Sequence, residues 1–166
     1  MSPENGMSTS EQHDRLMRQA IALAVENVEQ GRGGPFAALV VRGGSVIATG
    51  TNRVTTQNDP TAHAEVSAIR AACAALGDFQ LTGCTLYSTC EPCPMCLGAI
   101  YWARLSRVVY ASTQADAAAA GFDDAHIYEE LDRPPAERAI PMHQHLRNEA
   151  ARVFAAWEAY EERVAY

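Results

Sequence analysis

The residues best suited to chemistry fall into two short groups, His63-Ala64-Glu65 and, well downstream, Pro92-Cys93-Pro94-Met95-Cys96. His63, Cys93 and Cys96 offer an imidazole and two thiolates, which are typical ligands of Zn²⁺. Three protein ligands leave one corner of a tetrahedral ion open, as in catalytic rather than structural zinc sites. Glu65 is not needed as a ligand, so we expect its carboxylate beside the open corner, where it can carry protons.

Both groups are predicted to lie at the starts of helices. Thr61 or Asp59 can cap the first helix, and Pro92 suits the first turn of the second. The positive end of a helix favours thiolate over thiol, and an i, i+3 pair such as Cys93 and Cys96 shares one helix face. The two sulfurs can therefore converge on one ion.

A closed structural zinc site is the alternative, because Cys90-Glu91-Pro92-Cys93 is also a C-x-x-C sequence. We favour the open site for two reasons. Cys90 ends a predicted strand, whereas Cys93 and Cys96 lie on the following helix. A closed site would also hold no water for Glu65 to deprotonate.

The other possible ligands have simpler interpretations. Cys73 and Cys84 are expected to be buried thiols. His143 and His145 form an H-x-H sequence without an acidic or thiol partner nearby, so we expect them to be surface or packing residues.

Composition indicates one globular domain. The 166 residues are 48% hydrophobic, and the apolar runs are too short to span a bilayer, so no membrane partner is expected. Residues 1–12 lack the features of a signal peptide, and we expect a flexible leader there, one domain over 13–166 and a cytoplasmic location. Five cysteines, three of them clustered, then favour metal over disulfides. A net charge of −7 argues against a nucleic-acid polymer as partner.

Apolar periodicity predicts alternating helices and strands. We expect helices over 13–30, 62–76, 92–103 and near 147–163, and strands over 36–41, 46–51, 84–88 and 107–111. Gly43-Gly44 would join the first two strands as a hairpin. The two strand–helix–strand crossovers imply parallel neighbours in a sheet with helices on its faces, which is an α/β fold.

This constellation suits hydrolytic deamination. A zinc ion lowers the pKa of bound water from about 15.7 to near 7, which supplies a nucleophile for an electron-poor ring carbon that bears an amino group. Glu65 would take the proton from the water, deliver it to a ring nitrogen and help protonate the departing amine. Such general acid–base catalysis is worth roughly 10²–10⁴-fold.

The chain resembles the cytidine deaminase-like superfamily, whose zinc pattern is H-x-E followed by P-C-x-x-C. Three stretches carry a narrower resemblance. They read DPTAHAEVSAIRAAC, STCEPCPMCLGAIYWAR and AGFDDAHIYEEL. Within the superfamily the chain is similar to the bacterial guanine deaminases from about residue 13 onward. The resemblance implies a three-layer α/β/α sandwich with a five-stranded mixed sheet, one zinc ion per subunit, and conversion of guanine to xanthine and ammonia.

The same resemblance implies which residues contact the purine. Asn52 would hydrogen-bond the base, and Phe36 would pack against its ring, with Ala64 also at the substrate. Trp102 stands where the family keeps an aromatic residue near the site. Tyr166, at the end of the chain, would close over the substrate.

The resemblance also implies a carboxylate in the pocket, with Asp124 preferred over Asp123. Guanine carries a ring N–H where adenine has none, so a buried aspartate would be left unsatisfied by adenine at a cost of about 1–3 kcal/mol. A solvated turn or a helix cap is the other interpretation of these two residues. Members of this short type often form homodimers by exchanging C-terminal segments, so Asp124 and Tyr166 could come from the partner subunit.

Three other functions stay open. A tRNA adenosine deaminase shares the zinc pattern but should show a basic groove, and this acidic chain has no arginine cluster of that kind. The substrate could instead be another nucleobase, a nucleoside or an aminated triazine. A zinc-stabilised interaction module without catalysis is the alternative from a different class.

Overall fold

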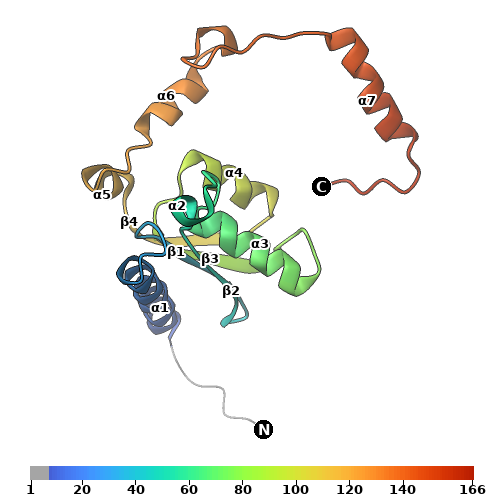
Figure 1. Cartoon of the computed structure of the whole chain (residues 1–166). Coiled ribbons are helices and arrows are strands. Elements are labelled where there is room, and N and C mark those ends of the chain that lie inside the picture. Colours follow the sequence, from blue (N-terminus) through green and yellow to red (C-terminus); the bar gives the residue numbers. More distant parts are fainter. Residues whose placement is uncertain (1–7) are drawn as a thin grey trace. The chain divides into compact units, whose positions relative to one another are not determined.

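The computed structural model describes residues 8–166, and the chain divides into two compact units between Asp124 and Ala125. The first unit holds one sheet with helices on both faces (Figure 1). Its strands are β1 (Ala37–Arg42), β2 (Ser45–Thr51), β3 (Cys84–Cys90) and β4 (Arg107–Ser112), in the order β2-β1-β3-β4. The α/β fold with a mixed sheet is therefore confirmed.

The prediction of five strands is wrong, because the described residues form four. After β4 the chain turns directly into α5 (Gln114–Ala119), whose N-cap Thr113 forms a capping box with Asp116. The alanine-rich segment that follows lacks the alternation of a strand, so it does not extend the sheet.

The prediction of parallel neighbours is half right. β3 and β4 pair in parallel, as expected for a strand–helix–strand crossover. β2 and β3 run in the same direction but are not neighbours, because β1 lies between them and is antiparallel to both. The hairpin places β1 at the centre, which the crossover rule alone does not reveal.

Helix α1 (Thr9–Glu29) covers one face of the sheet through Leu16 and Ala20, which pack on side chains of β1 and β3. Its N-cap Ser8 accepts a hydrogen bond from the backbone of Glu11, whose side chain bonds back to Ser8. The helix thus takes in 9–12 of the expected leader, and residues 1–7 lie outside the described part.

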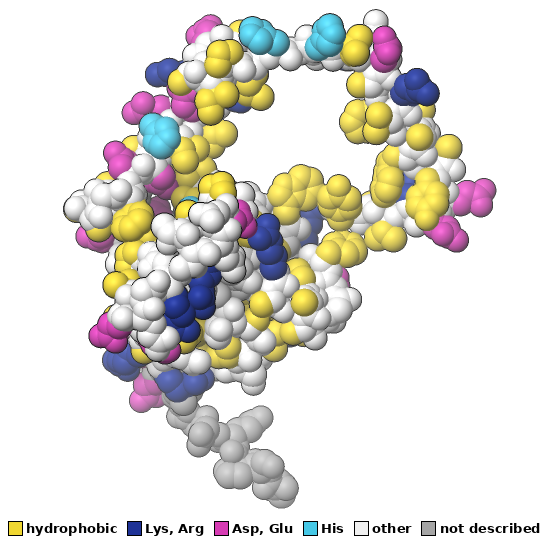
Figure 2. Space-filling view, viewed as in Figure 1, with side chains coloured by type: hydrophobic (Ala, Val, Ile, Leu, Met, Phe, Trp, Pro, Cys, Tyr) yellow, Lys and Arg dark blue, Asp and Glu magenta, His cyan; other side chains and the backbone are white. Residues whose placement is uncertain are grey.

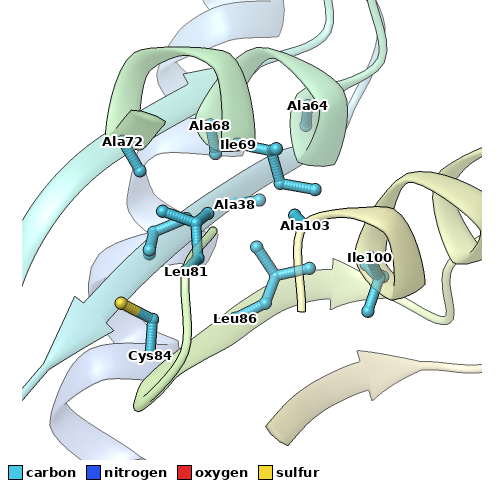
Figure 3. Close-up of a cluster of buried hydrophobic side chains, with 11 residues drawn as sticks. Ala38, Ala64, Ala68, Ile69, Ala72, Leu81, Cys84, Leu86, Ile100 and Ala103 are labelled. Carbon is cyan, nitrogen blue, oxygen red and sulfur yellow. The ribbon is translucent and has the colours of Figure 1, made fainter. Parts of the chain in front are cut away.

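The opposite face is covered by α3 (Ala64–Leu76) and α4 (Pro94–Trp102), and Figure 3 shows the core between them. Alanines at every fourth position of α3 face the sheet and allow a close approach. A Cβ atom at Gly50 of β2 would collide with the carbonyl oxygen of Ala64 and the backbone nitrogen of Ala68. Only a glycine at this position lets the first turn of α3 lie against the sheet.

The cysteines and histidines outside the two motifs lie mostly as predicted. Cys84 is fully buried in the core of Figure 3, whereas Cys73 is only partly buried. His143 and His145 are exposed.

The second unit consists of α6 (Ala125–Asp132), the 3₁₀ turn η1 (Pro135–Glu137) and α7 (Arg147–Ala159). None of its residues is buried. Figure 2 shows hydrophobic side chains at the surface of α7, where Val153 and Phe154 are both exposed. Among residues 8–166, no helix combines the length and the apolar character needed to cross a bilayer.

Candidate active site

Both motifs lie where a helix begins next to the sheet. His63 is the N-cap of α3 and Glu65 lies in its first turn, while Cys93 is the N-cap of α4 and Cys96 lies one turn further. The proline at the first position of α4 is Pro94, not Pro92 as predicted.

The predicted caps of the first helix are also wrong. The side chain of Asp59 accepts hydrogen bonds from the backbone and hydroxyl of Thr61, at 2.8 and 2.7 Å. The two residues therefore order the loop before His63 and do not cap α3.

His63, Cys93 and Cys96 converge as a metal site requires. The Nδ1 atom of His63 lies 3.5 Å from the sulfur of Cys93 and 3.5 Å from that of Cys96. With Zn–N near 2.05 Å and Zn–S near 2.3 Å, tetrahedral coordination places nitrogen and sulfur about 3.5–3.6 Å apart. The donor set and its nitrogen–sulfur spacings therefore fit Zn²⁺.

The fourth cysteine of the alternative closed site does not join this group. Within the described residues, the cluster that could hold a metal ion contains His63, Cys93 and Cys96. The sulfur of Cys90 lies 3.6 Å from the carbonyl oxygen of Thr113 instead. The geometry favours the open, three-ligand site.

The ligand side chains are electrostatically coupled. A hydrogen bond from Cys96, with one from His63, lowers the pKa of the Cys93 thiol to about 4. The same contact with Cys93, together with burial, raises the pKa of Cys96. Hydrogen bonding to Cys93 also raises the pKa of His63. A cation that binds here must displace the proton that the two sulfurs share.

Glu65 is 6% exposed and lies beside the metal ligands without being one of them. Its Oε1 accepts a hydrogen bond from the hydroxyl of Ser88 at 3.0 Å, and its Oε2 lies 3.4 Å from the sulfur of Cys96. Burial raises the pKa of the Glu65 carboxyl, which suits a group that must both take up and release a proton.

A cavity of about 220 Å³ opens beside these groups. It is lined by Phe36, Asn52, His63, Ala64, Glu65, Cys90, Glu91, Cys93, Ala117, Phe122, Asp123 and Asp124. The structure thus brings all but two of the predicted substrate contacts to one cavity. Trp102 is 63% exposed at the end of α4 and does not line it, and Tyr166 is exposed in the second unit.

The orientation of Asn52 is set by the backbone around it. Its Oδ1 accepts hydrogen bonds from the N–H groups of Gly34 at 3.2 Å and Val54 at 3.3 Å, so its Nδ2 is left to donate. Behind it, the buried amide of Asn27 donates to the carbonyl oxygens of Gly34 and Asn52 at 2.9 and 3.0 Å. The cavity therefore receives a fixed hydrogen-bond donor.

Two further contacts involve residues that line the cavity. The rings of Phe36 and Phe122 meet edge to face with their centroids 4.9 Å apart. Asp124 accepts a hydrogen bond from the side chain of Gln114 at 2.8 Å. A flat heteroaromatic ring can lie against a phenylalanine while an N–H on its edge meets the carboxylate.

Several of these residues were missed from the sequence. Phe122 stands in the GFDD stretch and Glu91 in the C-E-P-C stretch, so both were within reach of motif reasoning. Ser88 opens the STCEPC stretch, but its partner Glu65 lies 23 positions away. Asn27 and Gln114 carry no local signal, because their roles depend on residues elsewhere in the chain.

The chain has clear relatives among known proteins. A family model for the cytidine and deoxycytidylate deaminase zinc-binding region matches residues 10–112. Guanine deaminase of Bacillus subtilis (strain 168) is 54% identical over 154 residues, which is 93% of this chain and 99% of that protein. The tRNA-specific adenosine deaminase of Agrobacterium fabrum is 51% identical over 76 residues, 46% of this chain and 50% of the relative.

Solved structures agree with this pattern. The X-ray structure of guanine deaminase from Bacillus subtilis superposes with a TM-score of 0.91 over 93% of this chain and 98% of that chain, at 54% identity. A guanine deaminase from Nitrosomonas europaea gives a TM-score of 0.65 over 74% of this chain and 69% of that one, at 34% identity.

Proposed function

This chain belongs to the cytidine and deoxycytidylate deaminase family and, within it, to the guanine deaminases, and we propose that it hydrolyses guanine to xanthine and ammonia. One observation carries the proposal. Two of the three zinc-type ligands, His63 and Cys93, and the buried, unligated carboxylate of Glu65 line the same cavity as an amide donor at Asn52 and an acceptor at Asp124.

The protein's own groups account for the proton transfers. Zn²⁺ held by His63, Cys93 and Cys96 would supply an acidified water. Ser88 holds Oε1 of Glu65, so Oε2 would be the oxygen that takes up a proton and passes it to the ring nitrogen beside the attacked carbon. Glu65 then helps to protonate the amino group, which leaves as ammonia while the ring carbon keeps the oxygen as a carbonyl.

The walls of the cavity select the base. Guanine offers acceptors at O6 and N7, which suit the Nδ2 donor of Asn52. Its ring N–H suits the carboxylate of Asp124, which adenine would leave unpaired. The purine plane would pack against Phe36, whose ring Phe122 meets edge to face.

The proposal includes a homodimer with exchanged C-terminal segments. The second unit buries no side chain of its own, and α7 exposes Val153, Phe154 and Trp157. Apolar surface of this kind is stabilised when it packs on another chain. Exchange would bring Tyr166 to a partner's site, and Trp102 would complete it. Sedimentation equilibrium that finds only monomers would contradict the dimer.

A cytoplasmic location is also part of the proposal. All five cysteines are free, and three of them gather at or beside the metal site. Thiols in this state are typical of a reducing compartment.

A substrate panel tests the function. The purified protein, with its zinc content measured, is incubated with guanine, adenine, cytosine, their nucleosides and a tRNA anticodon stem-loop, and ammonia release is followed. We expect release from guanine and formation of xanthine. If guanine is inert while another compound is turned over, the substrate assignment fails.

A further inference from the structure

Gln114 connects two acidic side chains of the cavity wall from behind. Its side-chain Nε2 donates a hydrogen bond to Oδ1 of Asp124 at 2.8 Å, and its backbone N–H donates one to Oε2 of Glu91 at 3.0 Å. Asp124 and Glu91 line the cavity, whereas Gln114 does not. We propose that Gln114 is a positioning residue that fixes Asp124 for substrate binding, an inference that rests on the proposed function.

The backbone of Gln114 is held where β3 and β4 end and α5 begins. Gln114 is the first residue of α5 and follows Thr113, whose capping box with Asp116 fixes the start of the helix. Beside it, the backbone of Glu91 donates to the carbonyl oxygen of Ser112 at 2.9 Å, where β3 and β4 end together. The backbone position from which the Gln114 side chain extends is therefore fixed by the fold.

Residues 114–124 form a flap whose two ends are both tied down. At its base, the bond between Gln114 and Asp124 joins its first and last residues. Two residues before its end, Phe122 packs on Phe36, and the backbone N–H of Phe122 donates to the carbonyl oxygen of Ala117 at 2.9 Å. Phe122, Asp123 and Asp124 reach the cavity from this flap.

The bond decides which oxygen of Asp124 meets the base. Gln114 occupies Oδ1, so Oδ2 is left to accept from a ring N–H. Without the amide, a bound base would have to order the carboxylate itself, and that ordering weakens binding. Gln114 bonds to Asp124 and Glu91 rather than to Glu65 or the zinc ligands, so the chemical step should be largely preserved.

A double-mutant cycle tests this role. Gln114→Met keeps the length of the side chain but lacks the donor, and we expect KM for guanine to rise about tenfold with kcat changed less than about threefold. In an Asp124→Ala background the same change should raise KM less than about twofold, because its target is gone. Gln19→Met, at an exposed site on α1, is the matched control and should leave both constants unchanged.

An equal rise of KM in both backgrounds, or none in Gln114→Met, would overturn the role of Gln114. If the wild-type protein leaves guanine untouched, the proposed function fails instead, and the cycle is measured on the base that it does turn over. A second readout needs no activity. The side-chain amide resonances of Gln114 in a ¹H–¹⁵N spectrum should shift in Asp124→Ala, and unshifted resonances would contradict the contact itself.

Discussion

The hydroxyl of Ser88 donates a 3.0 Å hydrogen bond to Oε1 of Glu65, and both residues are buried. Ser88 lies on β3 and Glu65 in the first turn of α3, so the bond joins the sheet to the helix that carries the proton-transferring group. The bond holds Oε1, while Oε2 faces the sulfur of Cys96 at 3.4 Å and is the oxygen placed for proton transfer at the metal site.

Removing the hydroxyl should slow the reaction without removing the metal. In Ser88→Ala we expect kcat to fall about tenfold, because a hydrogen bond to a charged group is worth about 1.5–3 kcal/mol and Glu65 would no longer be held in one position. Steady-state kinetics and zinc analysis measure the two effects. Ser45→Ala, at an exposed position of β2, should behave as wild type. Unchanged kcat in Ser88→Ala would show that Glu65 is positioned without it.

Replacing the carboxylate should abolish nearly all turnover. Glu65→Gln keeps the size of the side chain but cannot accept a proton, so we expect kcat to fall by about 10²–10⁴-fold. Zinc content should stay near that of the wild type, because Glu65 is outside the ligand group. Glu29→Gln, exposed at the end of α1, serves as the control. Loss of zinc together with Glu65 would mean that this residue is a ligand.

Two cysteine variants distinguish the open from the closed zinc site. Cys93→Ser should lose zinc, because it removes one of three ligands, whereas Cys90→Ser should keep it. Metal content after extensive dialysis gives the answer. Loss of zinc in both variants would make Cys90 a fourth ligand and leave no corner open for water.

The buried amide of Asn27 should matter for both stability and binding. Asn27→Asp replaces a donor with an acceptor that faces the carbonyl oxygens of Gly34 and Asn52, so we expect the free energy of unfolding to fall by about 1–3 kcal/mol or more. KM for guanine should also rise, because the backbone of Asn52 would no longer be held by the Asn27 amide. Chemical denaturation and kinetics measure these effects, with the exposed Asn148→Asp as control. A variant with wild-type stability would contradict the network.

Local patterns in the sequence predicted most of the architecture. The strand expected over 107–111 is β4 (Arg107–Ser112), and the helix expected over 62–76 is α3 (Ala64–Leu76). These elements follow from runs of apolar residues and from the helix stop at Gly77, which adopts the left-handed conformation. The zinc ligands were found for a similar reason, because their spacing within each motif is short.

The hydrogen bonds that support the site could not be predicted, because they join distant parts of the chain. Asn27 reaches Asn52 across 25 positions, and Ser88 reaches Glu65 across 23. Nothing near Asn27 in the sequence marks it as a partner of the site, and Ser88, although it opens the STCEPC stretch, is joined to Glu65 only by the fold. The strand count failed for a related reason, since it came from resemblance and not from the residues after β4, which are helical here.

The geometry of the site depends on Gly50, a residue that has no side chain and takes no part in the reaction. Its missing side chain is what allows the backbone at Ala64 and Ala68 to touch β2, and His63 and Glu65 flank Ala64. A single methyl group there would lever the imidazole and the carboxylate away from the two sulfurs, which are anchored on a separate helix. The position of two residues of the site thus depends on a glycine hydrogen atom in β2, a strand that does not line the cavity.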